Sequence, residues 1–176
     1  MNTLNIHPLF VHFPIALLIL YTVLEIFRLP ILTRQQWNFY TKAVLLFTGI
    51  AGGFVSLQTG EWAERTYRGT PEMSLIHLHS TYAVAAMWVY GILGVLYFAE
   101  WVYRSNVLSS LPAGMAKAWN ALRVIDKTLF KTPLLILLSV IGLVLITITG
   151  ALGGAIVYGP TIDPVVSFFY TLLYKQ

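Results

Sequence analysis

The chain has 176 residues, of which 57% are hydrophobic and 10% are charged, and its mean hydropathy is +0.74. Soluble domains carry about 25% charged residues, and a chain this short has too little polar surface to cover so many apolar side chains. The composition therefore excludes a soluble enzyme, a disordered chain and a nucleic-acid-binding domain, and it indicates an integral membrane protein. The absence of cysteine also excludes thiolate metal sites and covalently attached haem.

Four apolar segments predict four transmembrane helices, because each approaches the roughly 20 residues that cross a hydrocarbon core of ~30 Å. In chain order they run about from Pro8 to Phe27, from Phe39 to Gly60, from His79 to Trp101 and from Pro133 to Tyr158. We therefore predict an all-α integral membrane protein. Its fold would be a four-transmembrane-helix bundle in which residues 1–176 form a single domain.

Two segments outside the spans also have a clear pattern. Ala113 to Lys131 places apolar residues on one helical face and basic residues off it. This predicts a cytoplasmic amphipathic helix on the membrane surface, between spans three and four. Asp163 to Tyr174 is short, aromatic and broken by proline, so we expect it to lie along the opposite interface rather than to cross again.

The basic residues predict the orientation. Eight of the eleven lysines and arginines fall on the side of the first and third connections, and such an excess marks the cytoplasmic side of a membrane protein. Both termini are then expected outside, with the chain in the inner (cytoplasmic) membrane of a bacterium. The lipid bilayer is the partner that this arrangement requires.

All four histidines lie at the predicted outer end of the bundle. His7 and His12 open the first span, and His77 and His79 open the third. Histidines two residues apart on a helix point to nearly opposite faces, and His79 is the better candidate to face the bundle. The second and fourth spans bring glycines and acids to the same end: Thr59, Gly60, Glu61, Glu64, Gly150, Gly153 and Gly154.

At this end of the bundle, His12 is a functional candidate, whereas His7, the glycines and the glutamates also have a structural explanation. His12 lies about 6 Å inside its span by helical rise, where an ionisable side chain is a functional candidate. His7 precedes Pro8, which is favoured at the first helical position, so His7 is equally well explained as an interfacial cap. The glycines are typical of close helix packing, and Glu61 and Glu64 are typical of solvated interfacial acids.

The segment HPLFVHFPIALL, residues 7–18, resembles the opening of a bacterial membrane family known as domain of unknown function 2231. The family shows His-Pro-x-x-x-His-Phe-Pro, a Thr-Gly at the end of its second span, a histidine that opens its third span and Gly-Gly-x-x-Val-Tyr in its fourth. The matching residues are His7, Pro8, His12, Phe13, Pro14, Thr59, Gly60, His79, Gly153, Gly154, Val157 and Tyr158. Many relatives carry His-Glu where this chain has His79-Ser80, and the family name implies no activity.

Three functions are compatible with this pattern. The first is a redox protein that holds haem b between His12 and His79, with His7 as a substitute ligand, because a helical bundle can hold haem through axial histidines. Its macrocycle would pack against Phe13, Gly53, Gly153 and Gly154. Such a cytochrome b-like protein, placed on the outer side, would exchange electrons with a quinol or a soluble cytochrome.

The second function is a non-haem metal-binding protein, in which His7, His12 or His79 joins Glu61 or Glu64 around zinc, copper or iron. The third is an accessory or scaffold subunit of a larger membrane complex. The sequence has no Ser-His-Asp order, no zincin motif and no phosphate-binding glycine loop. It therefore favours an electron-transfer or accessory protein over an enzyme with its own substrate.

Overall fold

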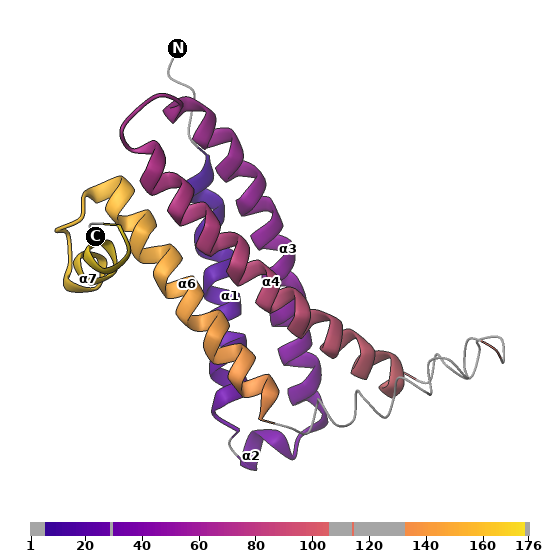
Figure 1. Ribbon diagram of the computed structural model, residues 1–176. Helices are drawn as coiled ribbons and strands as arrows, with labels where there is room; N and C mark the ends of the chain where they lie inside the picture. The colour runs from indigo at the N-terminus through magenta and orange to yellow at the C-terminus, as the bar shows by residue number, and fades with distance from the viewer. Residues whose placement is uncertain (1–5, 29, 106–113, 115–132, 175–176) are drawn as a thin grey trace.

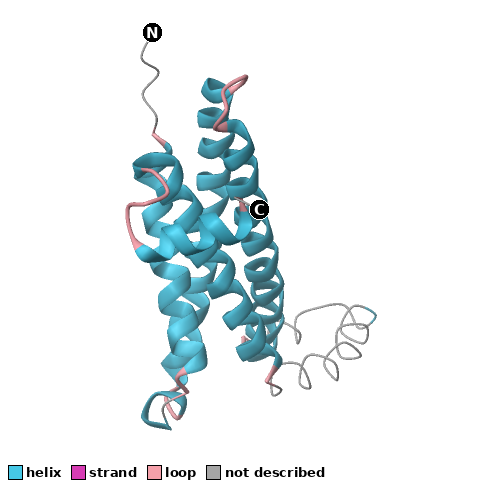
Figure 2. Cartoon of the chain, turned by 60° about the vertical axis from the view of Figure 1, so that its left-hand side comes forward, coloured by secondary structure: helices cyan, strands magenta, loops and turns pink. Residues whose placement is uncertain are grey.

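The computed structural model describes residues 6–28, 30–105, 114 and 133–174. Within these ranges the elements are α1 (His7–Ile26), α2 (Pro30–Thr33), α3 (Gln36–Glu64), the 3-10 turn η1 (Arg65–Tyr67), α4 (Met73–Arg104), α6 (Leu134–Tyr158) and α7 (Pro164–Leu173). Figure 2 shows that the described part of the chain is helical apart from short connections. Four helices, α1, α3, α4 and α6, are long and apolar enough to cross a membrane.

The predicted all-α bundle with four spans is therefore confirmed, and the chain is a multi-pass membrane protein. The helices α3 and α4 extend past the predicted spans, to Glu64 and back to Met73 respectively. The predicted amphipathic helix at 113–131 lies outside the described residues, apart from Gly114.

The four long helices alternate in direction (Figure 1). Helix α1 packs on α3 and α6, and α4 packs on the same two helices, so α1 and α4 lie diagonally across the bundle. One end of the bundle holds the first turns of α1 and α4 and the last turns of α3 and α6, and we call it the histidine end. We call the opposite end, where Glu25 lies near the end of α1, the glutamate end.

Large side chains fill the centre of the bundle, and two glycines make room for them. Leu18 and Tyr90 have 2% and 0% of their surface exposed. A Cβ atom on Gly49 would lie 2.7 Å from Cγ of Leu18, and one on Gly142 would lie 2.8 Å from Cζ of Tyr90. Real Cβ atoms do not approach other atoms so closely, so these glycines allow the helices to pack closely, as small residues do in membrane bundles.

The proline inside α1 explains one contact between α1 and α3. Pro14 has no N–H group, so the carbonyl of Phe10, four residues earlier, loses its helical hydrogen bond. The hydroxyl of Ser56 on α3 donates a hydrogen bond of 3.2 Å to that carbonyl. Gly52 lies beside the proline ring, since a Cβ there would be 3.3 Å from Cβ of Pro14. A membrane offers no water to satisfy such a carbonyl, so the serine replaces the missing bond.

Helix α7 follows α6 after a short turn and packs on it. Asp163 caps its first turn, because its Oδ1 accepts hydrogen bonds from the backbone N–H groups of Val165 and Val166 at 2.8 and 2.9 Å. Pro164 occupies the first turn of α7, where its missing N–H does no harm. At ten residues, α7 is too short to cross a membrane, as the sequence predicted.

Candidate functional site at the histidine end

His7 lies in the first turn of α1 and contacts the last turns of α3. Its Nδ1 is 3.1 Å from Oγ1 of Thr59. The Thr59 hydroxyl donates its own hydrogen to the carbonyl of Ser56 at 3.0 Å, so it accepts from Nδ1–H of His7. The ring also interacts with the backbone of Ser56. A neutral imidazole with its hydrogen on Nδ1 keeps the lone pair on Nε2.

His79, on α4, makes an equivalent contact with α6. Its Nδ1 lies 2.9 Å from the backbone carbonyl of Thr149. A carbonyl can only accept, so Nδ1 carries the hydrogen and Nε2 carries the lone pair. Within the described part of the chain, Nε2 of His79 makes no hydrogen bond. His7 lies close enough to His79 for the two rings to interact electrostatically.

Each of these two rings lies against a glycine of the facing helix. A Cβ atom on Gly60 would be 3.2 Å from Cε1 of His7, and one on Gly153 would be 3.2 Å from Cε1 of His79. The pair His7 and Thr59-Gly60 thus joins α1 to α3, and the pair His79 and Gly153 joins α4 to α6. The four sequence motifs that contain His7, Thr59-Gly60, His79 and Gly153 therefore meet in two similar contacts, each between a histidine ring and a glycine.

The structure places His12 and Phe13 at exposed positions of α1, and Phe13 has 60% of its surface accessible. His12 follows His7 by five residues, which is a rotation of about 140° around a helix, so the two point to different sides of α1. The structure therefore brings His7, and not His12, towards the face that His79 shares. Haem ligation by His12 stays a prediction that no contact in the structure supports.

Two of the predicted glycine positions are filled by protein. The space beside Gly53 holds the thioether of Met87, and a Cβ on Gly154 would lie 3.1 Å from Cγ2 of Val166. Both glycines therefore serve helix packing, with α4 and α7 respectively.

Each of the two predicted glutamate ligands contacts a residue other than His7 and His79. Glu61 is exposed, and its Oε2 accepts a hydrogen bond of 3.4 Å from Gln58. Glu64 lies 3.6 Å from Nδ1 of His77. Among the described residues, no group of three or more histidine, aspartate and glutamate side chains could hold a metal ion. The described residues thus do not form the predicted carboxylate–histidine site.

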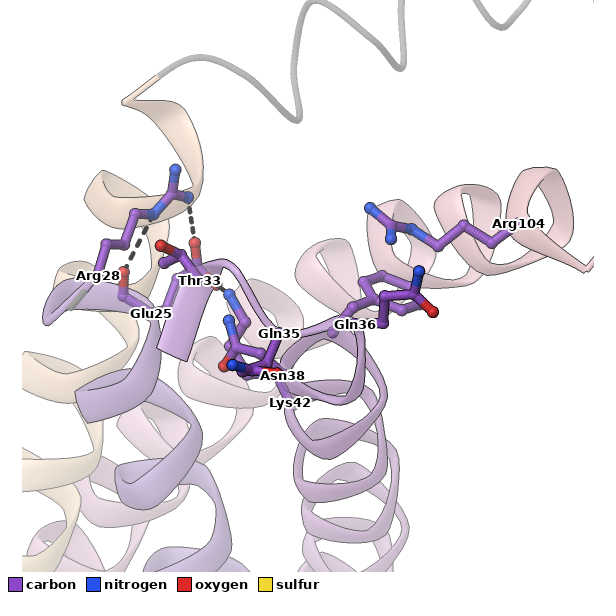
Figure 3. Close-up of a pocket in the computed structure, with 9 residues that line it drawn as sticks. Glu25, Arg28, Thr33, Gln35, Gln36, Asn38, Lys42 and Arg104 are labelled. Atoms are coloured by element: carbon purple, nitrogen blue, oxygen red, sulfur yellow. Dashed lines mark hydrogen bonds and ion pairs between the residues drawn. The ribbon is translucent and has the colours of Figure 1, made fainter. Parts of the chain in front are cut away.

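A second polar cluster lies at the glutamate end, and the sequence reasoning did not select it. Glu25 on α1 has no exposed surface. Its Oε2 accepts hydrogen bonds of 2.6 Å from Nζ of Lys42 and 2.6 Å from the hydroxyl of Tyr97, and its Oε1 accepts one from Arg28. One buried carboxylate therefore joins α1 to α3 and α4, and Figure 3 shows the charged groups around it.

Further hydroxyl groups continue from this cluster into the bundle. The hydroxyls of Tyr21 and Ser139 are buried, and neither makes a hydrogen bond with a described residue. Thr22 and Tyr90 pair at 3.0 Å between their hydroxyl oxygens. Buried hydroxyls without partners are typical of positions where a protein holds an ordered water molecule.

A signal for this cluster was present in the sequence. Glu25 stands two residues before the end of the first apolar segment, and an acid inside a span is costly unless it is paired. Its partners Lys42 and Tyr97 are 17 and 72 residues away, so only the packing of α3 and α4 identifies them.

Comparison with known proteins agrees with the motifs that meet at the histidine end. No curated protein and no solved structure matches the chain. The family described as predicted membrane protein (DUF2231) matches residues 3–163, a range that covers all four spans. The chain therefore belongs to the DUF2231 family of predicted membrane proteins.

Proposed function

We propose that this protein is a membrane redox protein that binds one haem b at the histidine end, with His7 and His79 as the axial ligands. The observation that carries the proposal is the hydrogen bonding of the two rings. Each Nδ1 donates to an oxygen of a neighbouring helix, Thr59 Oγ1 or the Thr149 carbonyl. Ligating histidines donate their other ring N–H in this way, and that bond fixes the tautomer and the orientation of the ring.

The set of donors fits haem b. Two imidazoles are all that a six-coordinate haem iron takes from the protein, and the two histidines belong to diagonal helices of the bundle. The absence of cysteine agrees with a non-covalent haem. Haem would supply a one-electron couple, and the protein would orient the ligands and surround the group with apolar side chains. In this proposal Gly53 and Gly154 do not contact the haem, because the side chains of Met87 and Val166 occupy the space beside them.

The proposal includes the location and the partners. With the glutamate end in the cytoplasm, as the basic residues predict, the haem would lie near the outer surface of a bacterial inner membrane. A quinol in the bilayer or a soluble cytochrome outside it would then be the electron donor or acceptor.

Alanine variants of the histidines test the proposal. Haem is titrated into each purified protein, and the absorption spectrum reports both binding and the spin state of the iron. We expect low-spin, six-coordinate haem in the parent protein, and high-spin or lost haem in His7→Ala and His79→Ala. The controls are His12→Ala and His77→Ala, which should match the parent, because both side chains are exposed.

Two other results would overturn the proposal. If the parent protein binds neither haem nor metal, the chain acts as an accessory or scaffold subunit of a larger membrane complex. If it holds zinc, copper or iron, and loses it in Glu61→Gln or Glu64→Gln, a histidine–carboxylate metal site replaces the haem site.

A further inference from the structure

The glutamate end contains a polar cavity, which is independent of the proposed haem site. Its volume is about 180 Å³, and it lies where α1 ends and α3 begins, at one end of the four membrane-spanning helices. Figure 3 shows side chains from α1, α2, α3 and α4 around it. The cavity is lined by Glu25, Arg28, Thr33, Gln35, Gln36, Asn38, Phe39, Lys42 and Arg104.

The charges in this cavity are arranged so that the cations lie nearer to the solvent than the carboxylate. The side chains of Arg28, Lys42 and Arg104 are 36%, 10% and 42% exposed. Glu25, which pairs with the first two, is 0% exposed. Glu100, which accepts a hydrogen bond of 2.7 Å from Arg104, is 19% exposed. A ligand that enters the cavity therefore meets the two arginines before it meets the carboxylate of Glu25.

Neutral groups add capacity for hydrogen bonding. Asn38 is only 7% exposed, and it lines the cavity. Its side-chain amide can donate and accept hydrogen bonds with a ligand there. Lys42 and the two arginines retain N–H groups beyond those that they donate to the carboxylates, because an ammonium has three donors and a guanidinium has five.

Exposed apolar side chains flank the cavity along the chain. Phe27, Ile31 and Trp37 have 62%, 73% and 52% of their surface accessible. They come from the segments that surround the cavity, the end of α1, α2 and the start of α3. A ligand with a charged head and a long apolar tail would contact both kinds of surface, whereas a free inorganic anion would use only the first.

We propose that this cavity binds the phosphate group of an anionic phospholipid, with Arg28, Lys42 and Arg104 as the cationic ligands and Asn38 as a neutral donor. Arginine pairs well with phosphate because its N–H groups form a planar fork. Basic pockets between transmembrane helices bind anionic lipid head groups in this manner. Glu25 is a positioning residue, which holds Arg28 and Lys42 in place from behind.

Lipid retention measured by native mass spectrometry tests this proposal. The protein is purified in detergent and titrated with phosphatidylglycerol or with phosphatidylcholine of the same acyl chains. We expect one phosphatidylglycerol to bind in preference to phosphatidylcholine. Each of Arg28→Gln and Arg104→Gln should weaken binding about fivefold, the effect of one basic residue near a lipid surface. Both side chains are partly exposed, so neither change should prevent folding.

The matched control is Arg68→Gln, which removes an exposed arginine at the histidine end and should leave lipid binding unchanged. Equal retention of both lipids, or equal loss in the control and in the two cavity variants, would overturn the proposal. A further arm uses inorganic phosphate without lipid. If phosphate alone raises the thermal stability of the parent protein as much as phosphatidylglycerol does, and the same variants abolish that effect, the ligand is a free anion and the assignment to a lipid is wrong.

Discussion

The buried ion pair between Glu25 and Lys42 gives a quantitative prediction about stability. The two atoms of the pair are 2.6 Å apart, and the side chains are 0% and 10% exposed. The change Lys42→Met removes the ammonium but keeps most of the volume, and it leaves the buried carboxylate of Glu25 without this partner. Breaking a buried pair from one side costs ~3–5 kcal/mol. Because Arg28 and Tyr97 still donate to Glu25, we expect a loss near the lower limit, about 3 kcal/mol.

The double variant Glu25→Leu with Lys42→Met should lose less than Lys42→Met alone. It contains no buried charge, since Arg28 is partly exposed and can turn to water, and the main loss is the hydrogen bond of Tyr97, about 1 kcal/mol. The assay is reversible unfolding in mixed micelles, followed by circular dichroism, with Arg34→Met as an exposed control. The single variant Glu25→Leu completes the comparison. If the stability lost by the double variant equals the sum of the losses of the two single variants, the pair has no coupling energy, and the stabilising role of the pair is refuted.

Three further predictions use the same assay or a simple reporter. Gly153→Ala should destabilise the protein by about 1 kcal/mol, as overpacking does, because the new Cβ would lie 3.2 Å from the ring of His79. The control Gly150→Ala, about one turn earlier, has open space around it and should show no loss of stability. Ser56→Ala should cost about 1 kcal/mol, typical of a hydrogen bond between membrane helices, and an unchanged stability would show that water replaces the hydroxyl. Reporters fused to the C-terminus and inserted at 106–132 should report opposite sides of the membrane, and a shared side would contradict the predicted topology.

The sequence predicted the number of spans and the end at which the histidines gather, but it favoured His12 over His7, whereas the ring of His7 contacts α3 and His12 is exposed. The choice between His7 and His12 depends on the rotation of α1 about its axis. In a soluble helix the apolar face would reveal that rotation. In a membrane both the lipid and the neighbouring helices are apolar, so the sequence of α1 shows no clear polar side.

The roles of the glycines were equally hidden from sequence reasoning. Gly53 and Gly153 lie in similar small-residue patterns, yet Met87 fills the space beside the first, and the ring of His79 lies against the second. A glycine signals a close approach, but the approaching side chain belongs to another helix. For the same reason the sequence shows Glu25 only as an acid near the end of a span, and the packing of α3 identifies Lys42 as its partner.

The absorption spectrum of the purified protein, recorded oxidised and then reduced with dithionite, shows whether the chain binds haem. We expect a Soret band and, on reduction, the sharp α and β bands of a low-spin haem b with two imidazole ligands. The ratio should be about one haem per chain, because His7 and His79 provide two axial ligands. A protein without haem, even after haem has been added to it in detergent, would contradict the proposed haem binding.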